Sequence, residues 1–254
     1  MGALHEGHLA LIRKAKAEND ATVCSIFVNP LQFNNREDFL KYPAVLEKDV
    51  QLLEQEGCDL LFAPSASEMY PSEPKLKFDF GHLEQVMEGA FRPGHFNGVA
   101  VVVSKLFHLV HPTVAYFGQK DLQQTLVVKQ LVEDLSFPLS VLVCDTVREQ
   151  DGLAMSSRNV RLTGSQREKA PILYETLCVV KDKIASGGSI PVILEEAKVS
   201  LSREADVKLE YLTAVDGDTL QPIGEAFTGQ VAICIAAYFG SVRLIDNVVF
   251  KKVV

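Results

Sequence analysis

Apolar residues in the first half of the chain follow two alternating periods, one helical and one typical of strands. Residues 8–19 place apolar side chains at helical spacing, and residues 21–28 (ATVCSIFV) form a β-branched run typical of a buried strand. The alternation continues with helices expected at 45–56, 98–110 and 122–135, and with strands expected at 59–62, 113–117 and 139–144. Because these strands are almost wholly apolar, we expect an α/β fold whose doubly wound parallel sheet is covered on both faces.

The pattern changes near residue 146. Two helices are expected beyond it, followed by three strands: 165–185, 191–204, 207–215, 230–239 and 242–250. Gly240 and Ser241 separate the last two strands as a tight hairpin. We therefore predict two domains, a parallel α/β domain at 1–146 and a smaller α+β domain at 147–254.

Composition and charge narrow the class of protein. The 254 residues are 47% hydrophobic with a formal net charge of −8, so a basic nucleic-acid or anionic-membrane binder is not expected. The longest apolar run, Val231 to Phe239, is too short to cross a bilayer, and no secretory signal is visible. Five scattered cysteines without a CxxC pair are typical of reduced thiols. These features predict a cytoplasmic protein without nucleic-acid or membrane partners.

The first eight residues, MGALHEGH, carry the first candidate chemistry. His5 and His8 flank Gly7 at the start of a predicted helix, where unpaired N–H groups favour a phosphate. Gly2 and Gly7 allow a ligand to approach the backbone closely. Two alternatives remain at this point: a metal-binding histidine pair, or a helix cap with incidental histidines.

Two further clusters also offer groups that bind phosphate. FGQKD (117–121) follows a strand and opens a helix, so Lys120 would lie at the carboxyl end of the sheet, where α/β proteins bind ligands. DGLAMSSRN (151–159) joins two hydroxyl groups to Arg158. Helix-start and turn roles are the alternatives for Asp121 and the serines.

Two further loops carry polar side chains. The side chains are uncharged in the first loop, and the second loop combines charged and uncharged groups. In SIFVNPLQF (25–33), Asn29 and Gln32 follow a buried strand and fit a polar, uncharged part of a substrate. EGAFRPGHFNGV (88–99) gathers Arg92, His95 and Asn97 in a segment rich in Pro and Gly, which is typical of a functional loop. An ordered surface loop is the alternative for each.

Taken together and in this order, the five segments resemble the pantothenate synthetase family. MGALHEGH is similar to its HxGH motif, and MSSR stands where related synthetases carry their KMSKS loop. The resemblance covers nearly the whole chain and implies a Rossmann-like HxGH nucleotidyltransferase fold with a C-terminal lid domain. It also implies an ATP-dependent ligase that joins (R)-pantoate to β-alanine through pantoyl adenylate, releases AMP and pyrophosphate, and forms a cytoplasmic homodimer.

The resemblance further implies residue roles. His8 would donate a proton to the departing pyrophosphate, with His5 beside it. The residues that match ATP-binding positions are Met1, Gly2, Ala3, Leu4, His5, Glu6, Gly7, His8, Gly118, Gln119, Lys120, Asp121, Val147, Met155, Ser156, Ser157 and Arg158. Gln32, Gln124 and Asn29 match positions for pantoate or β-alanine. Asp49 lies in the segment of a magnesium-linked acid, and Mg²⁺ is the expected companion of ATP.

One departure from the family pattern concerns the residues before the HxGH motif. Family members carry a β-strand that leads into this loop, whereas Met1 is the first residue of the motif here. We therefore expect a sheet that lacks a central strand, and a loop that lies free at its terminus. Two alternatives to the ligase remain: this shortened chain as an inactive binding or dimerisation module, or another HxGH adenylyltransferase. The latter usually lacks the NPLQF and RPGHF segments together.

Overall fold

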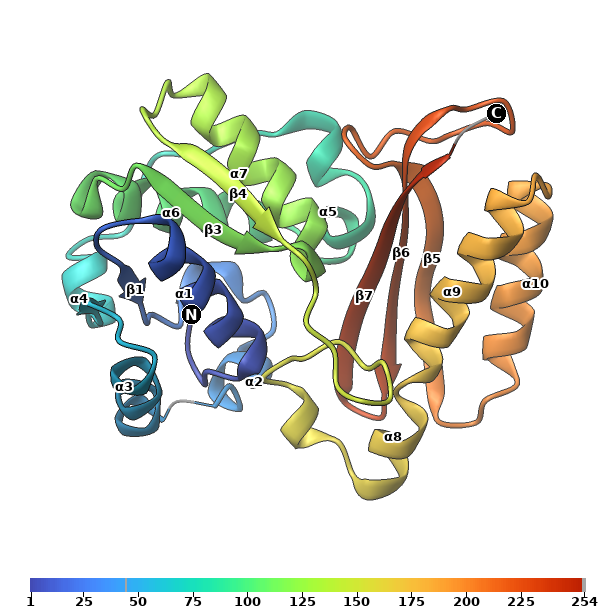
Figure 1. Cartoon of the computed structure of the whole chain (residues 1–254), viewed down its shortest axis with the longest axis horizontal. Coiled ribbons are helices and arrows are strands. Elements are labelled where there is room, and N and C mark those ends of the chain that lie inside the picture. Colours follow the sequence, from blue (N-terminus) through green and yellow to red (C-terminus); the bar gives the residue numbers. More distant parts are fainter. Residues whose placement is uncertain (44, 253–254) are drawn as a thin grey trace. The chain divides into compact units, whose positions relative to one another are not determined.

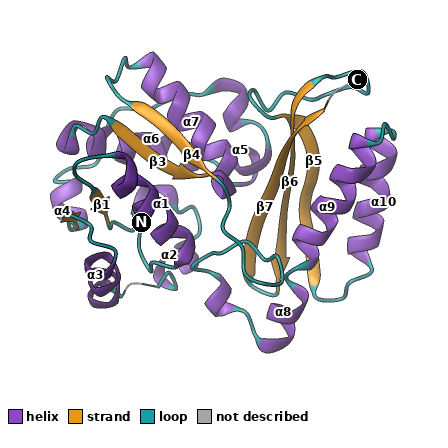
Figure 2. Cartoon of the chain, viewed as in Figure 1, coloured by secondary structure: helices purple, strands orange, loops and turns teal. Residues whose placement is uncertain are grey.

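The computed structural model describes residues 1–43 and 45–252. The chain divides into two compact units, Met1–Val147 and Arg148–Val254 (Figure 1). The first unit contains parallel strands and helices, and the second contains an antiparallel sheet with helices (Figure 2). The predicted change from parallel α/β to α+β organisation along the chain is therefore confirmed.

The first unit contains two pairs of parallel strands. β1 (Val23–Ser25) pairs with β2 (Leu60–Phe62), and β3 (Val114–Gly118) pairs with β4 (Ser140–Cys144). Within residues 1–43 and 45–252 the two pairs are separate two-stranded sheets, and no described strand joins them. β1 is shorter than predicted, although the Ile26 N–H donates to the Phe62 carbonyl and extends the contact between β1 and β2.

Helices surround these strands and build two apolar clusters. Their bounds are α1 Glu6–Glu18, α2 Arg36–Leu40, α3 Leu46–Gln55, α4 Ala66–Met69, α5 Met87–Phe91, α6 His95–Val110 and α7 Leu122–Asp134, with 3₁₀ turns η1 Pro30–Gln32, η2 Gly81–Glu84 and η3 Gln119–Asp121. One cluster joins Leu9 of α1 to Cys24 and Leu53. The other joins Val99 of α6 to Leu131 of α7. The predicted helices at 8–19, 45–56, 98–110 and 122–135 are confirmed to within a few residues.

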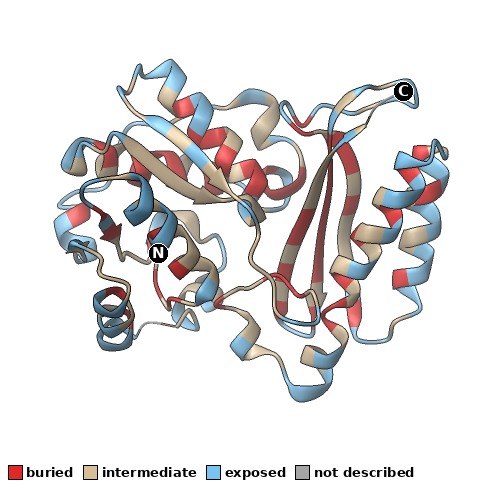
Figure 3. Cartoon of the chain, in the orientation of Figure 1, coloured by how far each residue is buried: buried red, intermediate tan, exposed pale blue. Residues whose placement is uncertain are grey.

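The second unit is a three-stranded antiparallel sheet with two long helices. Its elements are η4 Asn159–Arg161, α8 Gly164–Lys169, α9 Ile172–Ala185, α10 Ile190–Ser202, β5 Val207–Asp216, β6 Gly229–Phe239 and β7 Val242–Lys252. β6 pairs with both neighbours and is buried along most of its length (Figure 3). The helix expected at 165–185 is divided into α8 and α9, because Pro171 lacks the N–H that a continuous helix requires there.

The hairpin between β6 and β7 has the predicted form. Phe239 pairs with Val242, and Gly240 takes a φ of 59°, which is open to glycine without steric cost. None of the helices among the described residues combines the length and apolarity that a bilayer span requires.

Candidate active site

A buried carboxylate anchors the loop that precedes α1. The side chain of Asp49, which lies on α3 and is 1% exposed, accepts the N–H of Ala3 at 2.8 Å and the N–H of Leu4 at 2.7 Å. The Phe27 N–H also donates to the carbonyl of Met1 at 3.0 Å. The expectation that this loop lies free is therefore wrong, because two hydrogen bonds to a buried carboxylate and one to the chain after β1 hold it.

His5 and His8 lie against each other at the start of α1. Their ring centroids are 3.9 Å apart, and the His5 N–H donates to Nδ1 of His8 at 3.3 Å. Burial, followed by the charges of His5, the N-terminal amine and Lys120, lowers the pKa of His8 to about 2. His8 is therefore neutral near pH 7, and its proton lies on Nε2 because Nδ1 accepts a hydrogen bond.

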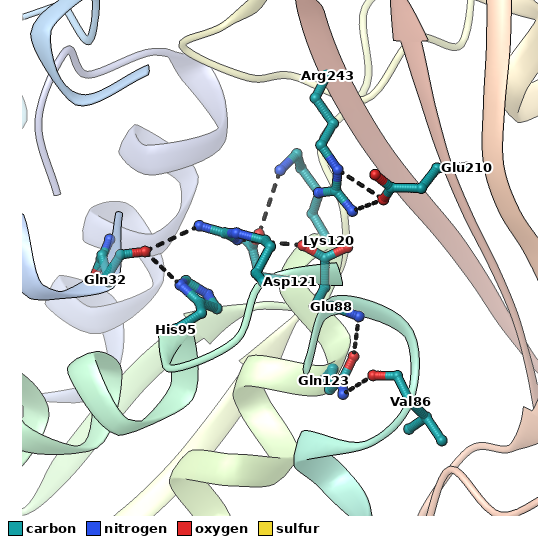
Figure 4. Close-up of polar contacts among 10 residues, drawn as sticks. Gln32, Val86, Glu88, His95, Lys120, Asp121, Gln123, Glu210 and Arg243 are labelled. Atoms are coloured by element: carbon teal, nitrogen blue, oxygen red, sulfur yellow. Dashed lines mark hydrogen bonds and ion pairs between the residues drawn. The ribbon is translucent and has the colours of Figure 1, made fainter. Parts of the chain in front are cut away.

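Lys120, from the predicted FGQKD segment, lies close enough to His8 to affect its pKa. It lies in η3, directly after β3, and its Nζ is 3.5 Å from Oδ1 of Asp121 (Figure 4). Its charge lowers the pKa of His8, so the two side chains share one electrostatic environment. Gly118 and Gln119 form the link from β3 to this turn. The structure thus gathers the predicted HxGH and FGQKD segments within the first unit.

Asn29 and Gln32 occupy the turn η1 after β1. Asn29 is buried, and its Nδ2 donates to the Gly98 carbonyl at 3.0 Å and to Oε1 of Gln32 at 3.3 Å. Its Oδ1 accepts the Leu31 N–H at 3.2 Å and the Tyr70 hydroxyl at 2.9 Å. The Asn29 amide is therefore fully engaged by protein groups, which favours a role in holding Gln32 over direct contact with a substrate.

The glutamine next to the predicted Gln124 is buried and bonded within the protein. Gln123 lies on α7, and its Oε1 accepts the Glu88 N–H at 2.9 Å (Figure 4). Its Nε2 donates to the carbonyls of Leu83 at 2.6 Å and Val86 at 2.9 Å. Gln123 thus ties α7 to the segment before α5. The contact of Gln124 with a substrate stays a prediction.

The predicted loop Met155–Arg158 lies in the second unit as a local turn. The Arg158 N–H donates to Oγ of Ser156 at 3.2 Å, and Ser157 is buried. Asn159 closes the turn, since its Nδ2 donates to Oε1 of Glu149 at 3.0 Å and to the Ala154 carbonyl at 3.1 Å. Val147, the predicted adenine contact, is the last residue of the first unit.

Arg148 anchors the base of this loop, a role that the sequence did not indicate. Its guanidinium donates to both carboxylate oxygens of Asp246, at 2.6 and 3.0 Å, and to the Gly152 carbonyl at 3.0 Å. It also lies 3.7 Å from the centroid of the Tyr174 ring. Arg148 and Asp246 are 98 residues apart in sequence, and no local pattern announces such a pair.

The structure offers no resident metal site in the part of the chain that it describes. Among residues 1–43 and 45–252, no group of three or more His, Cys, Asp and Glu side chains could hold a metal ion. Both oxygens of Asp49 accept backbone N–H groups, so this carboxylate organises the loop. The donor set therefore does not fit a metal held by protein ligands alone.

Comparison with known proteins identifies the family of this chain. Residues 1–249 match the family described as pantoate-beta-alanine ligase. The pantothenate synthetase of Cytophaga hutchinsonii is 51% identical over 251 residues, which cover 98% of this chain and 89% of that protein. The pantothenate synthetase of Thermus thermophilus is 48% identical over 248 residues, 97% of this chain and 90% of that protein.

Solved structures give the same result and confirm the Rossmann-like fold with a C-terminal domain. The crystal structure of pantothenate synthetase from Thermus thermophilus superimposes with a TM-score of 0.93 at 47% identity, covering 98% of this chain and 90% of that one. The Francisella tularensis pantoate-beta-alanine ligase, complexed with beta-gamma ATP and beta-alanine, has a TM-score of 0.81 at 38% identity and covers 99% and 87%. On these matches, the chain belongs to the pantoate–β-alanine ligase family.

Proposed function

We propose that this protein condenses (R)-pantoate with β-alanine to pantothenate, using ATP and a pantoyl-adenylate intermediate. The observation that carries the proposal is the anchored HxGH loop, in which neutral His8 shares its surroundings with the Lys120 ammonium. Family membership over residues 1–249 supports this chemistry over that of another HxGH adenylyltransferase.

In the first step, a pantoate carboxylate oxygen attacks the α-phosphorus of ATP. The new P–O bond forms while the bond to the β-phosphate bridging oxygen breaks, and pyrophosphate leaves with that electron pair. His8 donates a hydrogen bond from Nε2 to the bridging oxygen as negative charge develops there. The low pKa of His8 favours this hydrogen bond over full proton transfer, because a neutral imidazole is a very weak acid.

Further segments of the chain are assigned to the binding of ATP. We assign the segments Met1–His8 and Gly118–Asp121 to ATP, with Lys120 on its phosphates. Val147 contacts adenine, and Met155–Arg158 contact the phosphates. The first unit, Met1–Val147, is then the domain that binds ATP and pantoate, and the second unit, Arg148–Val254, is the lid domain. Hydroxyl and guanidinium donors in the sequence MSSR support the phosphate role.

In the second step, the β-alanine amine attacks the acyl carbon of the adenylate. The C–N amide bond forms, the bond between the acyl carbon and the AMP phosphate oxygen breaks, AMP leaves with that electron pair, and the amine nitrogen loses one proton to solvent. Gln32 and Gln124 hold the pantoyl group, with Asn29 fixing Gln32. The Oε1 atom of Gln32 accepts from Asn29, so its Nε2 hydrogens are offered to a ligand oxygen. No covalent enzyme intermediate is required.

We further propose that ATP enters as its Mg²⁺ complex. The lack of a three-residue metal cluster among the described residues supports coordination of this ion mainly by phosphate oxygens. The resemblance also supports a cytoplasmic location and a homodimeric state. Sedimentation equilibrium of the purified protein tests the homodimer.

The decisive experiment is pantoate-dependent exchange between ATP and labelled pyrophosphate. We expect exchange that requires pantoate and proceeds without β-alanine, and pantothenate formation once β-alanine is added. Exchange with phosphopantetheine or nicotinate mononucleotide in place of pantoate would indicate another HxGH adenylyltransferase. A folded protein that exchanges with none of these would be the inactive binding or dimerisation module.

A further inference from the structure

We propose that His95 is a positioning residue that fixes the backbone of Gln32 and thereby aims the Gln32 amide at pantoate. This inference rests on the proposed function and assigns a role in it to the segment EGAFRPGHFNGV. The role differs from substrate contact, since His95 acts through another residue.

His95 and Arg92 both donate to one carbonyl oxygen, that of Gln32. Nδ1 of His95 lies 2.8 Å from this oxygen (Figure 4). Nη2 of Arg92 lies 3.3 Å from the same oxygen. A carbonyl only accepts, so Nδ1 must carry the proton. Burial, followed by the charge of Arg92, lowers the pKa of His95 to about 4, which keeps the 6%-exposed ring neutral in this tautomer near pH 7.

The start of α6 fits closely against the turn that carries Gln32. A Cβ atom at Gly98 would lie 2.3 Å from the Leu31 carbonyl oxygen and 2.8 Å from the Gln32 nitrogen. Only glycine allows this approach. His95 is the first residue of α6, after Gly94 with a φ of 79°. One rigid helix end therefore presents both the His95 donor and the Gly98 carbonyl to η1.

Gln32 is held at its side chain as well as at its backbone. Asn29 donates to its Oε1 at 3.3 Å, and the same Asn29 nitrogen donates to the Gly98 carbonyl of α6. The His95 bond to the Gln32 backbone and the Asn29 bond to the Gln32 side chain thus both lead back to the first turn of α6. Holding a binding group in its working geometry before the ligand arrives reduces the entropy lost on binding.

Arg92 is itself fixed from α5. Its Nη1 lies 3.3 Å from Oε2 of buried Glu88, whose N–H is accepted by Gln123 of α7. The carbonyl of Gln32 therefore lies at the end of a continuous polar chain from α7. Removal of His95 leaves Arg92 in place, so a measurable but partial effect is expected.

The test is a double-mutant cycle on the whole chain. His95→Phe keeps an aromatic ring but removes the donor, and should raise KM for pantoate by about 3- to 10-fold, the value of one neutral hydrogen bond. KM for ATP should not change. His95→Asn, whose amide nitrogen occupies nearly the Nδ1 position, should restore much of the loss. In a Gln32→Ala background, His95→Phe should add almost nothing.

His108→Phe is the matched control, because His108 is an exposed histidine at the other end of α6 and should behave as wild type. Equal effects of His95→Phe in the two backgrounds would overturn the inference. A parallel rise in KM for ATP and pantoate, with a lower melting temperature, would also overturn it and indicate a purely structural role. If wild type lacks pantoate-dependent exchange, the proposed function falls, and this inference falls with it.

Discussion

Asp49 and Leu4, 45 residues apart, are joined by a 2.7 Å hydrogen bond from a backbone N–H to a buried carboxylate. The second oxygen of Asp49 binds the neighbouring Ala3 N–H. These bonds set the direction of the loop that leads to His5 and His8. A carboxylate that the family resemblance associates with a metal thus holds the backbone of the proposed nucleotide loop.

Asp49→Asn should disorder this loop. The NH₂ group of the asparagine would face the N–H of either Ala3 or Leu4, and two donors cannot form a hydrogen bond with each other. A lost hydrogen bond to a charged group costs about 1.5–3 kcal/mol, so KM for ATP in exchange should rise by about 10-fold or more. Glu47→Gln, in the same first turn of α3, is the control and should leave exchange intact. Full recovery by excess Mg²⁺ would instead support a metal-binding role for Asp49.

His8→Ala should slow adenylate formation by about 10²-fold, the usual effect of a positioned hydrogen-bond or acid group. Pantoate-dependent exchange measures this step directly. Thermal melting should change little, because the capping contact from His5 to His8 is long at 3.3 Å. A loss of stability without a specific loss of exchange would assign His8 to the helix cap.

Gln123 and Gln124 provide a contrast between adjacent, chemically identical side chains. Gln124→Ala should raise KM for pantoate while leaving the melting temperature unchanged. Gln123→Ala removes one buried and two partly buried hydrogen bonds and should lower the free energy of unfolding by about 1–3 kcal/mol. Urea unfolding and substrate kinetics on both variants separate these outcomes. The reverse pattern would exchange the two assignments.

Acid should destabilise the protein through its neutral histidines. The pKa values of His8 and His95 are lowered to about 2 and about 4 in the folded state, whereas histidine in an unfolded chain titrates near 6.5. Between pH 6.5 and 4 the unfolded chain therefore binds more protons, so stability falls as pH falls. Each histidine contributes a slope of about 1.4 kcal/mol per pH unit.

Urea unfolding of wild type and His95→Phe across this pH range measures that slope. The variant should lose stability less steeply on acidification, because one of the two histidines with a strongly lowered pKa is gone. Parallel curves for the two proteins would show that His95 does not bind fewer protons when folded.

The pair of Arg148 and Asp246 should control the stability of the second unit. Asp246→Ala leaves a partly buried guanidinium without its carboxylate and should cost about 3–5 kcal/mol. The double variant Arg148→Met with Asp246→Leu removes both charges and should recover most of that loss. Chemical denaturation followed by circular dichroism provides the comparison. Equal instability of the single and double variants would contradict the assignment of the cost to the unpaired charge.

Structural features that depend on residues close together in sequence could be predicted. The periodic apolar positions of α6 and α7 predicted both helices, and the glycine at position 240 predicted the hairpin between β6 and β7. The sequence predicts the HxGH and FGQKD segments at ligand-binding ends of elements. In the fold the two segments are close enough that the charge of Lys120 lowers the pKa of His8. Such signals depend on backbone preferences and periodicity, which act over a few residues.

Pairings between distant residues were not predictable from one sequence. Nothing near Asp49 indicates that its oxygens bind the loop at Ala3, and nothing near Arg148 indicates Asp246. Sequence also could not distinguish the buried Gln123 from Gln124, because one helical step decides which of them faces inward. Tertiary packing fixes these choices.

The close fit of Gly98 against Leu31 has a consequence for ligand discrimination. Because the turn at Pro30–Gln32 already touches the helix backbone, it cannot retreat to admit a larger group. Pantoate analogues with added bulk next to Gln32 should therefore be rejected, whereas smaller analogues should bind with a loss that reflects only their missing contacts. This turn is therefore expected to exclude ligands larger than pantoate but not smaller ones.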